Sequence, residues 1–320
     1  MPNSCIYEKF IVPLPTKQLI ITIMNKIFTI FCALLCTVST WAHDFEMNGI
    51  YYNHLQGNEV EVTFCGEDAG FAYENNIIIP DSILYNDTTY YVSSIGRGAF
   101  LYSVLLTDVV IPNSVKEIGV GAFATCIALK NITLPDSLTC IGDWAFRDCI
   151  SLIDITIPNN VKNIGNEAFA GCENLVFVNI GNGVTDLGIG TFTGTAIYNN
   201  SSNWEQGLFY IGDCLVEACD GISGACVIKD GTRFIANRAF YDSHLLTNVT
   251  IPSSVTHIGY EAFYGCESIR KINCYALVPP VLGANVFEKV EEPILYVLEE
   301  SGWLYINSEG WSKFSTYIKK

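Results

Sequence analysis

The chain has 320 residues; half are hydrophobic, 16% are charged, and the net charge at pH 7 is −16. This composition excludes an intrinsically disordered protein. Only 17 Lys and Arg residues are present, spread along the whole length, which argues against a nucleic-acid partner.

The N-terminal segment 1–42 has the pattern of a leader. A charged start at Met24 to Lys26 precedes an apolar stretch over 27–38, and Ala42 ends an acceptable cleavage site, which together indicate a secretory signal peptide over 24–42. In that case translation starts at Met24, and residues 1–23 result from a gene model that begins too early. The alternative is one uncleaved membrane helix over 19–42, which would place Lys26 inside the span at a cost. Cleavage leaves 14 basic and 32 acidic residues, a net charge of −18.

Residues 43–76 are expected to form an N-terminal β cap. Polar and apolar residues alternate over 57–64, the period of a half-buried strand. A β-hairpin there would cover the edge of the structure that follows.

Phenylalanine recurs at a constant interval, and this period dominates the chain. It occupies positions 100, 123, 146, 169 and 192, in equal steps of 23. After a gap of 48 it returns at 240 and 263, and a last phenylalanine follows at 287. A fixed period of this length indicates a solenoid, whose units must stack to bury their apolar faces. We expect such stacked units, here called rungs, over 77–293, with an irregular rung at 193–239 and a C-terminal cap over 294–320.

Each rung contains a short strand and a turn. In the rung of residues 129–152, the stretch 131–134 alternates as a strand does, and Pro135 ends it. Gly142 permits the next bend, and residues 143–147 are long enough for one helical or 3₁₀ turn. Consecutive rungs would place parallel strands side by side.

The repeated text resembles a known family. The unit I-P-x-S-V-x-x-I-G-x-x-A-F-x-x-C-x-x-L occurs at 111–129, 134–152, 157–175 and 251–269, the last closing with Ile. It resembles the BspA-like, or treponemal-type, leucine-rich repeat. The resemblance implies an α/β repeat solenoid: a right-handed superhelix with a parallel sheet of short strands, short helical or 3₁₀ turns opposite, and β caps at both ends. It also implies an exported or surface protein with an adhesion-like role and no enzymatic activity, and it carries no binding residues over to this chain.

Ten cysteines follow the leader. Four of them stand three residues after a repeat phenylalanine and are expected to be unbonded core thiols: Cys126, Cys149, Cys172 and Cys266. One disulfide is an open alternative among the three cysteines of the irregular rung: Cys214, Cys219 and Cys226. No paired Cys/His spacing suits zinc, so we expect no metal and no cofactor.

Strand alternation predicts which side chains face outward. Positions eight and ten after each Phe form two outward columns, here called the outer columns, whose small polar side chains and single aromatic suit a peptide or glycan ligand. The alternative is that Thr and Asn are simply solvent-facing strand residues. The candidate ligand-facing residues are Asp108, Asn131, Thr133, Asp154, Thr156, Phe177, Asn179, Asn248 and Thr250.

These features together predict a non-enzymatic exported protein that binds an extracellular protein or glycan. The chain ends shortly after the expected cap with no sorting motif, so a secreted, periplasmic or cell-surface location is expected, with no membrane span after signal cleavage. The alternatives are a self-associating envelope scaffold and, third, a hydrolase with an unrecognised site. The oligomeric state is left open.

Overall fold

The computed structural model describes residues 43–64, 73–314 and 317–319. The chain divides into a unit of residues 1–42 and a unit of residues 43–320, and only the second is described below. The expected leader and its alternative, an uncleaved membrane helix, therefore lie outside the described residues. None of the described helices is long and apolar enough to cross a membrane.

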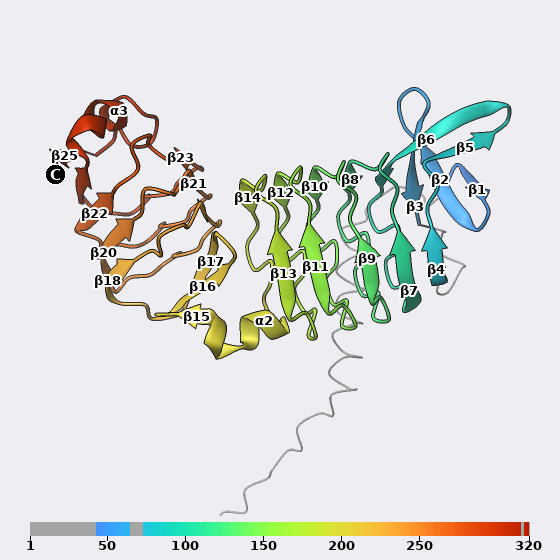
Figure 1. Cartoon of the computed structure of the whole chain (residues 1–320), viewed down its shortest axis with the longest axis horizontal. Coiled ribbons are helices and arrows are strands. Elements are labelled where there is room, and N and C mark those ends of the chain that lie inside the picture. Colours follow the sequence, from blue (N-terminus) through green and yellow to red (C-terminus); the bar gives the residue numbers. More distant parts are fainter. Residues whose placement is uncertain (1–42, 65–72, 315–316, 320) are drawn as a thin grey trace, which may run out of the picture. The chain divides into compact units, whose positions relative to one another are not determined.

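Antiparallel strand pairs form the N-terminal end of the stack (Figure 1). They are β1 (Phe45–Met47), β2 (Ile50–His54), β3 (Glu59–Thr63), and the hairpin of β5 (Ser82–Tyr85) and β6 (Thr88–Ile95). In β3 the side chains of Val60 and Val62 are buried and that of Glu59 is exposed, as the alternation over 57–64 predicted. Because β3 pairs in parallel with β6, which in turn pairs with the next rung, the N-terminal strands join the repeat through a continuous ladder.

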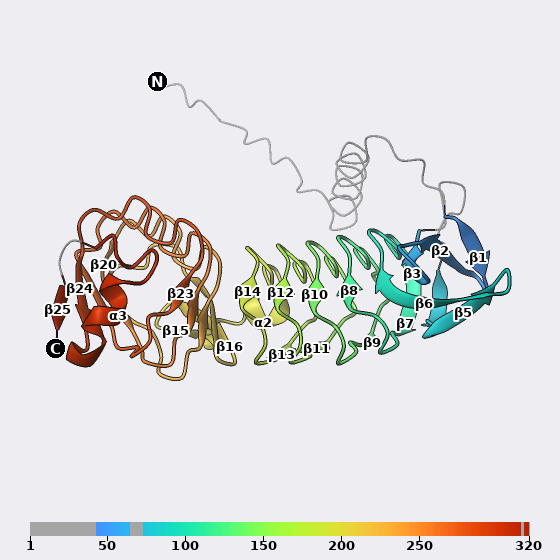
Figure 2. The ribbon, with the colours of Figure 1, turned by 90° about the horizontal axis from the view of Figure 1, so that it is seen from above.

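The rungs stack in parallel through two ladders, and Figure 2 shows them side by side from above. The first consists of a three-stranded sheet, β4 (Glu74–Ile78), β7 (Leu105–Val110) and β9 (Asn131–Thr133), followed by a two-stranded sheet, β11 (Asp154–Ile157) and β13 (Phe177–Ile180). The second contains β8 (Glu117–Ile118), β10 (Cys140–Ile141), β12 (Asn163–Ile164) and β14 (Asp186–Leu187). Residues one period apart are partners in both, such as Asp108 with Asn131 and Glu117 with Cys140. The repeat solenoid predicted from the period is confirmed, and it has one more ladder than the sequence indicated.

An antiparallel hairpin interrupts the stack. It follows α2 (Ala196–Asn199) and η1 (Ser201–Asn203) and contains β15 (Trp204–Glu205), β16 (Leu208–Ile211) and β17 (Cys214–Ala218). Parallel stacking then resumes in two ladders. These are β19 (Phe234–Ile235), β21 (His257–Ile258) and β23 (Val281–Leu282), and β18 (Gly224–Val227), β20 (Leu246–Ile251), β22 (Lys271–Cys274), β24 (Ile294–Val297) and β25 (Tyr317–Lys319).

The hairpin separates two hydrophobic cores. Phe209 and Val216 pack into the core of the preceding rungs, whereas Leu208 and Leu215 pack into the core of the following ones. A strand buried on both faces needs apolar side chains on both, which explains the continuous apolar run of β16. The irregular rung therefore covers the end of the first core with one face and the start of the second core with the other.

The repeat phenylalanines form two columns of stacked rings. From Phe100 to Phe192 the centroids of consecutive rings are 4.8–5.7 Å apart and their planes are within 4° of parallel. A second column runs from Phe240 through Phe263 to Phe287, at 4.7 and 5.4 Å. All of these rings are buried, so each phenylalanine is a core residue that contacts its counterparts in the neighbouring rungs.

The segment that carries each phenylalanine is a series of hydrogen-bonded turns, such as residues 143–148, which differs from the predicted helical or 3₁₀ turn. The N–H of Phe123 donates to the carbonyl of Ala145 in the next rung at 2.7 Å, whereas the N–H of Ala122 donates to Gly119 in its own rung at 3.2 Å. Left-handed residues such as Trp144, with φ of 57°, accompany this alternation. A helix uses its N–H groups within its own segment, so sharing alternate ones with the next rung prevents a helix.

The cysteine column consists of unbonded buried thiols, as predicted. The Sγ of Cys126 and that of Cys149 donate to the carbonyls of Phe100 and Phe123 in the preceding rung at 3.0 and 3.2 Å. Burial raises the pKa of both thiols well above the usual range, so they stay protonated and can donate. A small buried donor is therefore what this position requires.

The glycine of each I-G pair has a different role from the bend that the sequence suggested. Gly142 does not have the positive φ that would require glycine. Instead, a Cβ built on Gly142 would lie 2.8 Å from the backbone of Gly119, and one built on Gly165 would overlap the backbone nitrogen of Asp143. Consecutive rungs approach too closely here for any side chain.

Gly165→Ala is therefore expected to destabilise the protein by about 1–3 kcal/mol, the usual cost of an overpacked site. The loss would appear as a lower urea midpoint at an unchanged denaturant slope. Asn163→Ala, two positions away on the exposed side of β12, is the matched control and should change stability by at most about 0.5 kcal/mol. Equal midpoints for the two variants would contradict the close approach.

The C-terminal segment covers the last rung. The segment 294–320 contains the strands β24 and β25 and, between them, η2 (Glu299–Ser301) and α3 (Gly302–Ile306), which the sequence did not indicate. Trp311 is fully buried, its Nε1 donates to the carbonyl of Pro280 at 2.8 Å, and its ring centroid lies 5.5 Å from that of Phe287. The column of phenylalanine rings therefore ends on a tryptophan.

Candidate functional site

The outer columns face solvent in the first half of the stack. In β11 and β13 the burial alternates strictly, with Asp154, Thr156, Phe177 and Asn179 exposed. The register places Asp154 beside Phe177 and Thr156 beside Asn179. Two further predicted residues, Asn131 and Thr133 of β9, are also exposed, and Asp108 of β7 is half-buried.

The polar column is hydrogen-bonded between rungs. Asn131 Nδ2 donates to Asp108 Oδ1 at 2.7 Å. Hydrogen bonds from the side chains of Thr107 and Asn131, together with the charge of Lys130, hold the pKa of Asp108 below its usual range. Asp108 is therefore a fixed acceptor with a negative charge at neutral pH.

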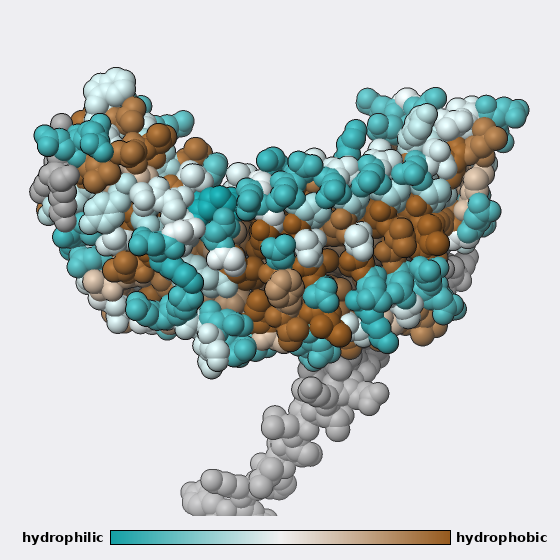
Figure 3. Space-filling view, in the orientation of Figure 1, coloured by the Kyte–Doolittle hydropathy of each residue, from teal (hydrophilic) through white to brown (hydrophobic). Residues whose placement is uncertain are grey.

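Exposed apolar side chains adjoin these polar residues, because Ile153 directly precedes Asp154 and Val176 directly precedes Phe177. Ile153, Val176 and Phe177 are 53%, 57% and 59% exposed, and Figure 3 shows a brown area at β11 and β13 among hydrophilic residues. Phe177 was predicted, but Ile153 and Val176, seven positions after a repeat phenylalanine, were not. The sequence offered one indication: the position seven after the phenylalanine is polar in two rungs, as Thr107 and Lys130, and becomes branched and apolar in the next two. We call Ile153, Val176 and Phe177 the apolar patch.

The second half of the stack does not extend this surface. Asn248 and Thr250 of β20 are half-buried and lie in a sheet separate from that of β11 and β13. Their neighbour Asn273 is buried, and its Nδ2 donates to Thr250 Oγ1 at 3.1 Å. The Nζ of Lys271 lies 4.6 Å from the ring centroid of Tyr296. Seven of the nine candidate residues therefore belong to the first half, and Asn248 and Thr250 belong to a different, less exposed surface.

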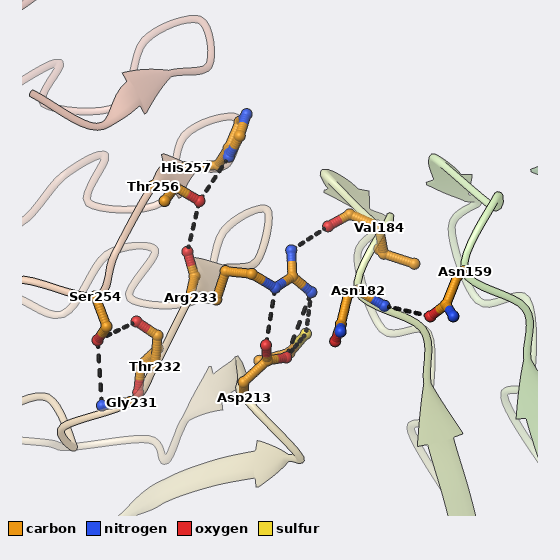
Figure 4. Close-up of polar contacts among 11 residues, drawn as sticks. Asn159, Asn182, Val184, Asp213, Gly231, Thr232, Arg233, Ser254, Thr256 and His257 are labelled. Carbon is orange, nitrogen blue, oxygen red and sulfur yellow. Dashed lines mark hydrogen bonds and ion pairs between the residues drawn. The ribbon is translucent and has the colours of Figure 1, made fainter. Parts of the chain in front are cut away.

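Arg233 joins the two halves at the irregular rung (Figure 4). Its guanidinium donates from Nε to Asp213 Oδ2 at 2.8 Å and from Nη1 to the carbonyl of Val184 at 2.7 Å. Burial and the charge of Arg233 lower the pKa of the nearby His257, which keeps its imidazole neutral at pH 7. These contacts hold the halves together and do not converge on an open site.

In the described part of the chain, no group of three or more His, Cys, Asp or Glu could hold a metal ion. Cys214, Cys219 and Cys226 are free thiols, so the open alternative of a disulfide among them is not found. Burial raises the pKa of Cys214 to about 12 and that of Cys226 to about 11. Such thiols are protonated at neutral pH and are poor nucleophiles.

Several solved structures are similar to this chain. A leucine-rich repeat protein from Bacteroides ovatus ATCC 8483 is 24% identical over 80% of this chain and 84% of its own, with a TM-score of 0.42. The T. pallidum leucine-rich repeat protein is 22% identical over 77% and 88%, with a TM-score of 0.39. A leucine-rich cell surface protein from Faecalibacterium prausnitzii A2-165 is 19% identical over 86% and 98%, with a TM-score of 0.41. No curated protein matches the chain.

The repeats themselves match one family. The BspA type leucine rich repeat region is found in six copies over residues 93–223 and 222–293. These ranges include both halves of the stack and the hairpin between them, and they make up more than half of the chain. The chain belongs to the BspA-type leucine-rich repeat family.

Proposed function

We propose that this protein is an exported, non-enzymatic binding protein whose ligand is an extracellular protein or glycan. The apolar patch and the outer columns beside it are the proposed contact surface. The observation that carries the proposal is the apolar patch itself: three large apolar side chains, each more than half exposed, next to the inter-rung bond between Asn131 and Asp108.

The chemistry of this surface suits recognition better than catalysis. An exposed aromatic ring contributes large contact area at low entropic cost, and Asn and Thr side chains both donate and accept hydrogen bonds. Asp108 and Asp154, which are two sequence periods apart, give the surface negative charge. A surface of mixed apolar and polar side chains is typical of a protein interface.

Binding to immobilised extracellular-matrix proteins and mucin glycans tests the proposal. Phe177→Ala is expected to weaken capture at least about fivefold, because truncating an aromatic residue that anchors an interface costs more than about 1 kcal/mol. Tyr91→Ala removes an equally exposed ring from β6 and should leave capture unchanged.

Equal loss in both variants, or no captured ligand at any salt concentration, would contradict the proposal. Light scattering on the same samples separates the alternative of a self-associating scaffold. A mass that rises with concentration and falls in Phe177→Ala would favour that alternative, because a second copy would then occupy the apolar patch.

A further inference from the structure

A pocket of about 370 Å³ lies where the hairpin interrupts the stack. One wall is the turn of residues 189–193, and the opposite wall is formed by residues 237–239 and 241–243. The end of the hairpin, residues 216–221, lies between them. The volume is within the range of ligand sites, and none of the lining residues belongs to the apolar patch.

Backbone donors on the first wall lack the partners that their counterparts have. In the preceding rung, the N–H groups of Glu167 and Phe169 donate to the next rung at 2.9 Å. The equivalent N–H groups of Gly190 and Phe192 find no acceptor among the described residues. The break coincides with the hairpin, since residues 189–193 and 216–221 line the same pocket and only five residues separate β17 from β18.

Backbone acceptors on the opposite wall are open in the same way. The carbonyl of Ala239 accepts from Ala218 N at 2.8 Å. The carbonyls of Asn237 and Tyr241, at positions that accept from the preceding rung elsewhere in the stack, receive no donor from the described residues. Donors on one wall and acceptors on the other match an inserted segment that repeats the regular turns, in which the N–H of Phe123 donates to the next rung and the carbonyl of Ala122 accepts from the preceding one. Glycine adopts the alternating left-handed conformation of these turns at little cost.

The side chains at the end of the hairpin are acidic. The hydroxyl of Tyr198 donates to Glu217 Oε1 at 3.1 Å, which orients this carboxylate. Burial, and to a smaller extent the charge of Asp220, raise the pKa of Glu217, partly offset by the bond from Tyr198. The one cationic residue among those lining the pocket, Arg238, is already paired with Glu261 at 2.7 Å. The carboxylates of Glu217 and Asp220 therefore have no cationic partner among the residues that line the pocket.

We propose that this pocket binds an extended peptide segment that carries a basic side chain. The peptide carbonyls would accept from the N–H groups of Gly190 and Phe192, and its N–H groups would donate to the opposite wall. The ammonium or guanidinium group would lie at Glu217 and Asp220. This site is separate from the surface of the proposed function and does not depend on it.

Isothermal titration of the full chain with a blocked pentapeptide, four glycines around a central lysine, tests the proposal. The same peptide with norleucine in place of lysine keeps the backbone and the aliphatic stem and removes the charge. We expect the lysine peptide to bind at least tenfold more tightly than the norleucine peptide. No saturable binding of the lysine peptide, or equal binding of both, would overturn the proposal.

Variants of the acidic end locate the site. Glu217→Gln and Asp220→Asn should each weaken the lysine peptide at least threefold, and the exposed Asp220 gives a variant that leaves the hairpin core intact. Glu173→Gln, an exposed carboxylate outside the pocket, is the matched control, and Phe177→Ala tests independence from the apolar patch. Both controls should bind as the unmodified chain does, and a loss in Glu173→Gln equal to that in Asp220→Asn would overturn the assignment.

Discussion

Phe146→Ala is expected to lower the free energy of unfolding by about 3–5 kcal/mol, the range for deleting a buried aromatic ring. The ring of Phe146 is fully buried and stacks on both neighbours, with centroids 5.1 and 5.2 Å from those of Phe123 and Phe169. Its loss removes two ring contacts. The cavity cannot collapse, because ladder hydrogen bonds on both sides of the rung keep the neighbouring rungs at their spacing.

Urea unfolding followed by circular dichroism measures this loss, and hydrogen exchange of the flanking amides shows where it acts. Phe177→Ala is the matched control, since it removes the same ring from an exposed position of the same half. A stability change within about 0.5 kcal/mol is expected for that control. Similar losses in both variants would mean that the buried column does not stabilise the stack.

The pitch and the core of the fold could be predicted because they depend on side chains that recur at equal steps. Phe123, Phe146 and Phe169 are separated by one period each, and only a stack brings such residues into contact. The turns could not be predicted in the same way. A helical turn and the observed turn both bury the phenylalanine, and they differ in where alternate N–H groups donate. That choice depends on the neighbouring rung, and a left-handed Trp144 is unusual for its residue type.

The surface could be predicted only where alternation holds. Within β13, Phe177 and Asn179 alternate with buried Val178, so their exposure follows from the period of a strand. Val176 precedes the strand and is exposed as well, so alternation alone misses it. Asn273, ten positions after Phe263, is buried although the equivalent Thr133 of the first half is exposed, and strand alternation does not signal that difference.

The sequence indicated where the stack is irregular, but it did not indicate which groups line the pocket there. The doubled interval between Phe192 and Phe240 indicated where the stack is irregular. The unpaired groups that line the pocket belong to the backbone: they include the N–H of Gly190 and the carbonyl of Asn237. Because almost every residue carries both groups, the residue type does not show which of them are unpaired. Whether they are paired depends on how far the hairpin reaches, and no residue type reports that distance.

Trp311→Ala is expected to destabilise the second half of the stack by about 3–5 kcal/mol. Trp311 covers the last ring of its column, Phe287, and pairs the carbonyl of Pro280. Without it, the apolar end of the stack is exposed to water, and capping units of a repeat protein are required for solubility. Lower solubility should therefore accompany the lower stability.

The two separate cores determine where this loss should appear. The hairpin stands between the rungs of Phe146 and those of Phe263, so hydrogen exchange should accelerate in β20 and β22 and remain nearly unchanged in β9 and β11. Trp303→Ala, an exposed tryptophan (70%) in the same terminal segment, is the matched control and should change neither half. Equal acceleration in both halves after Trp311→Ala would show that the stack unfolds as one unit and that the hairpin does not separate two cooperative parts.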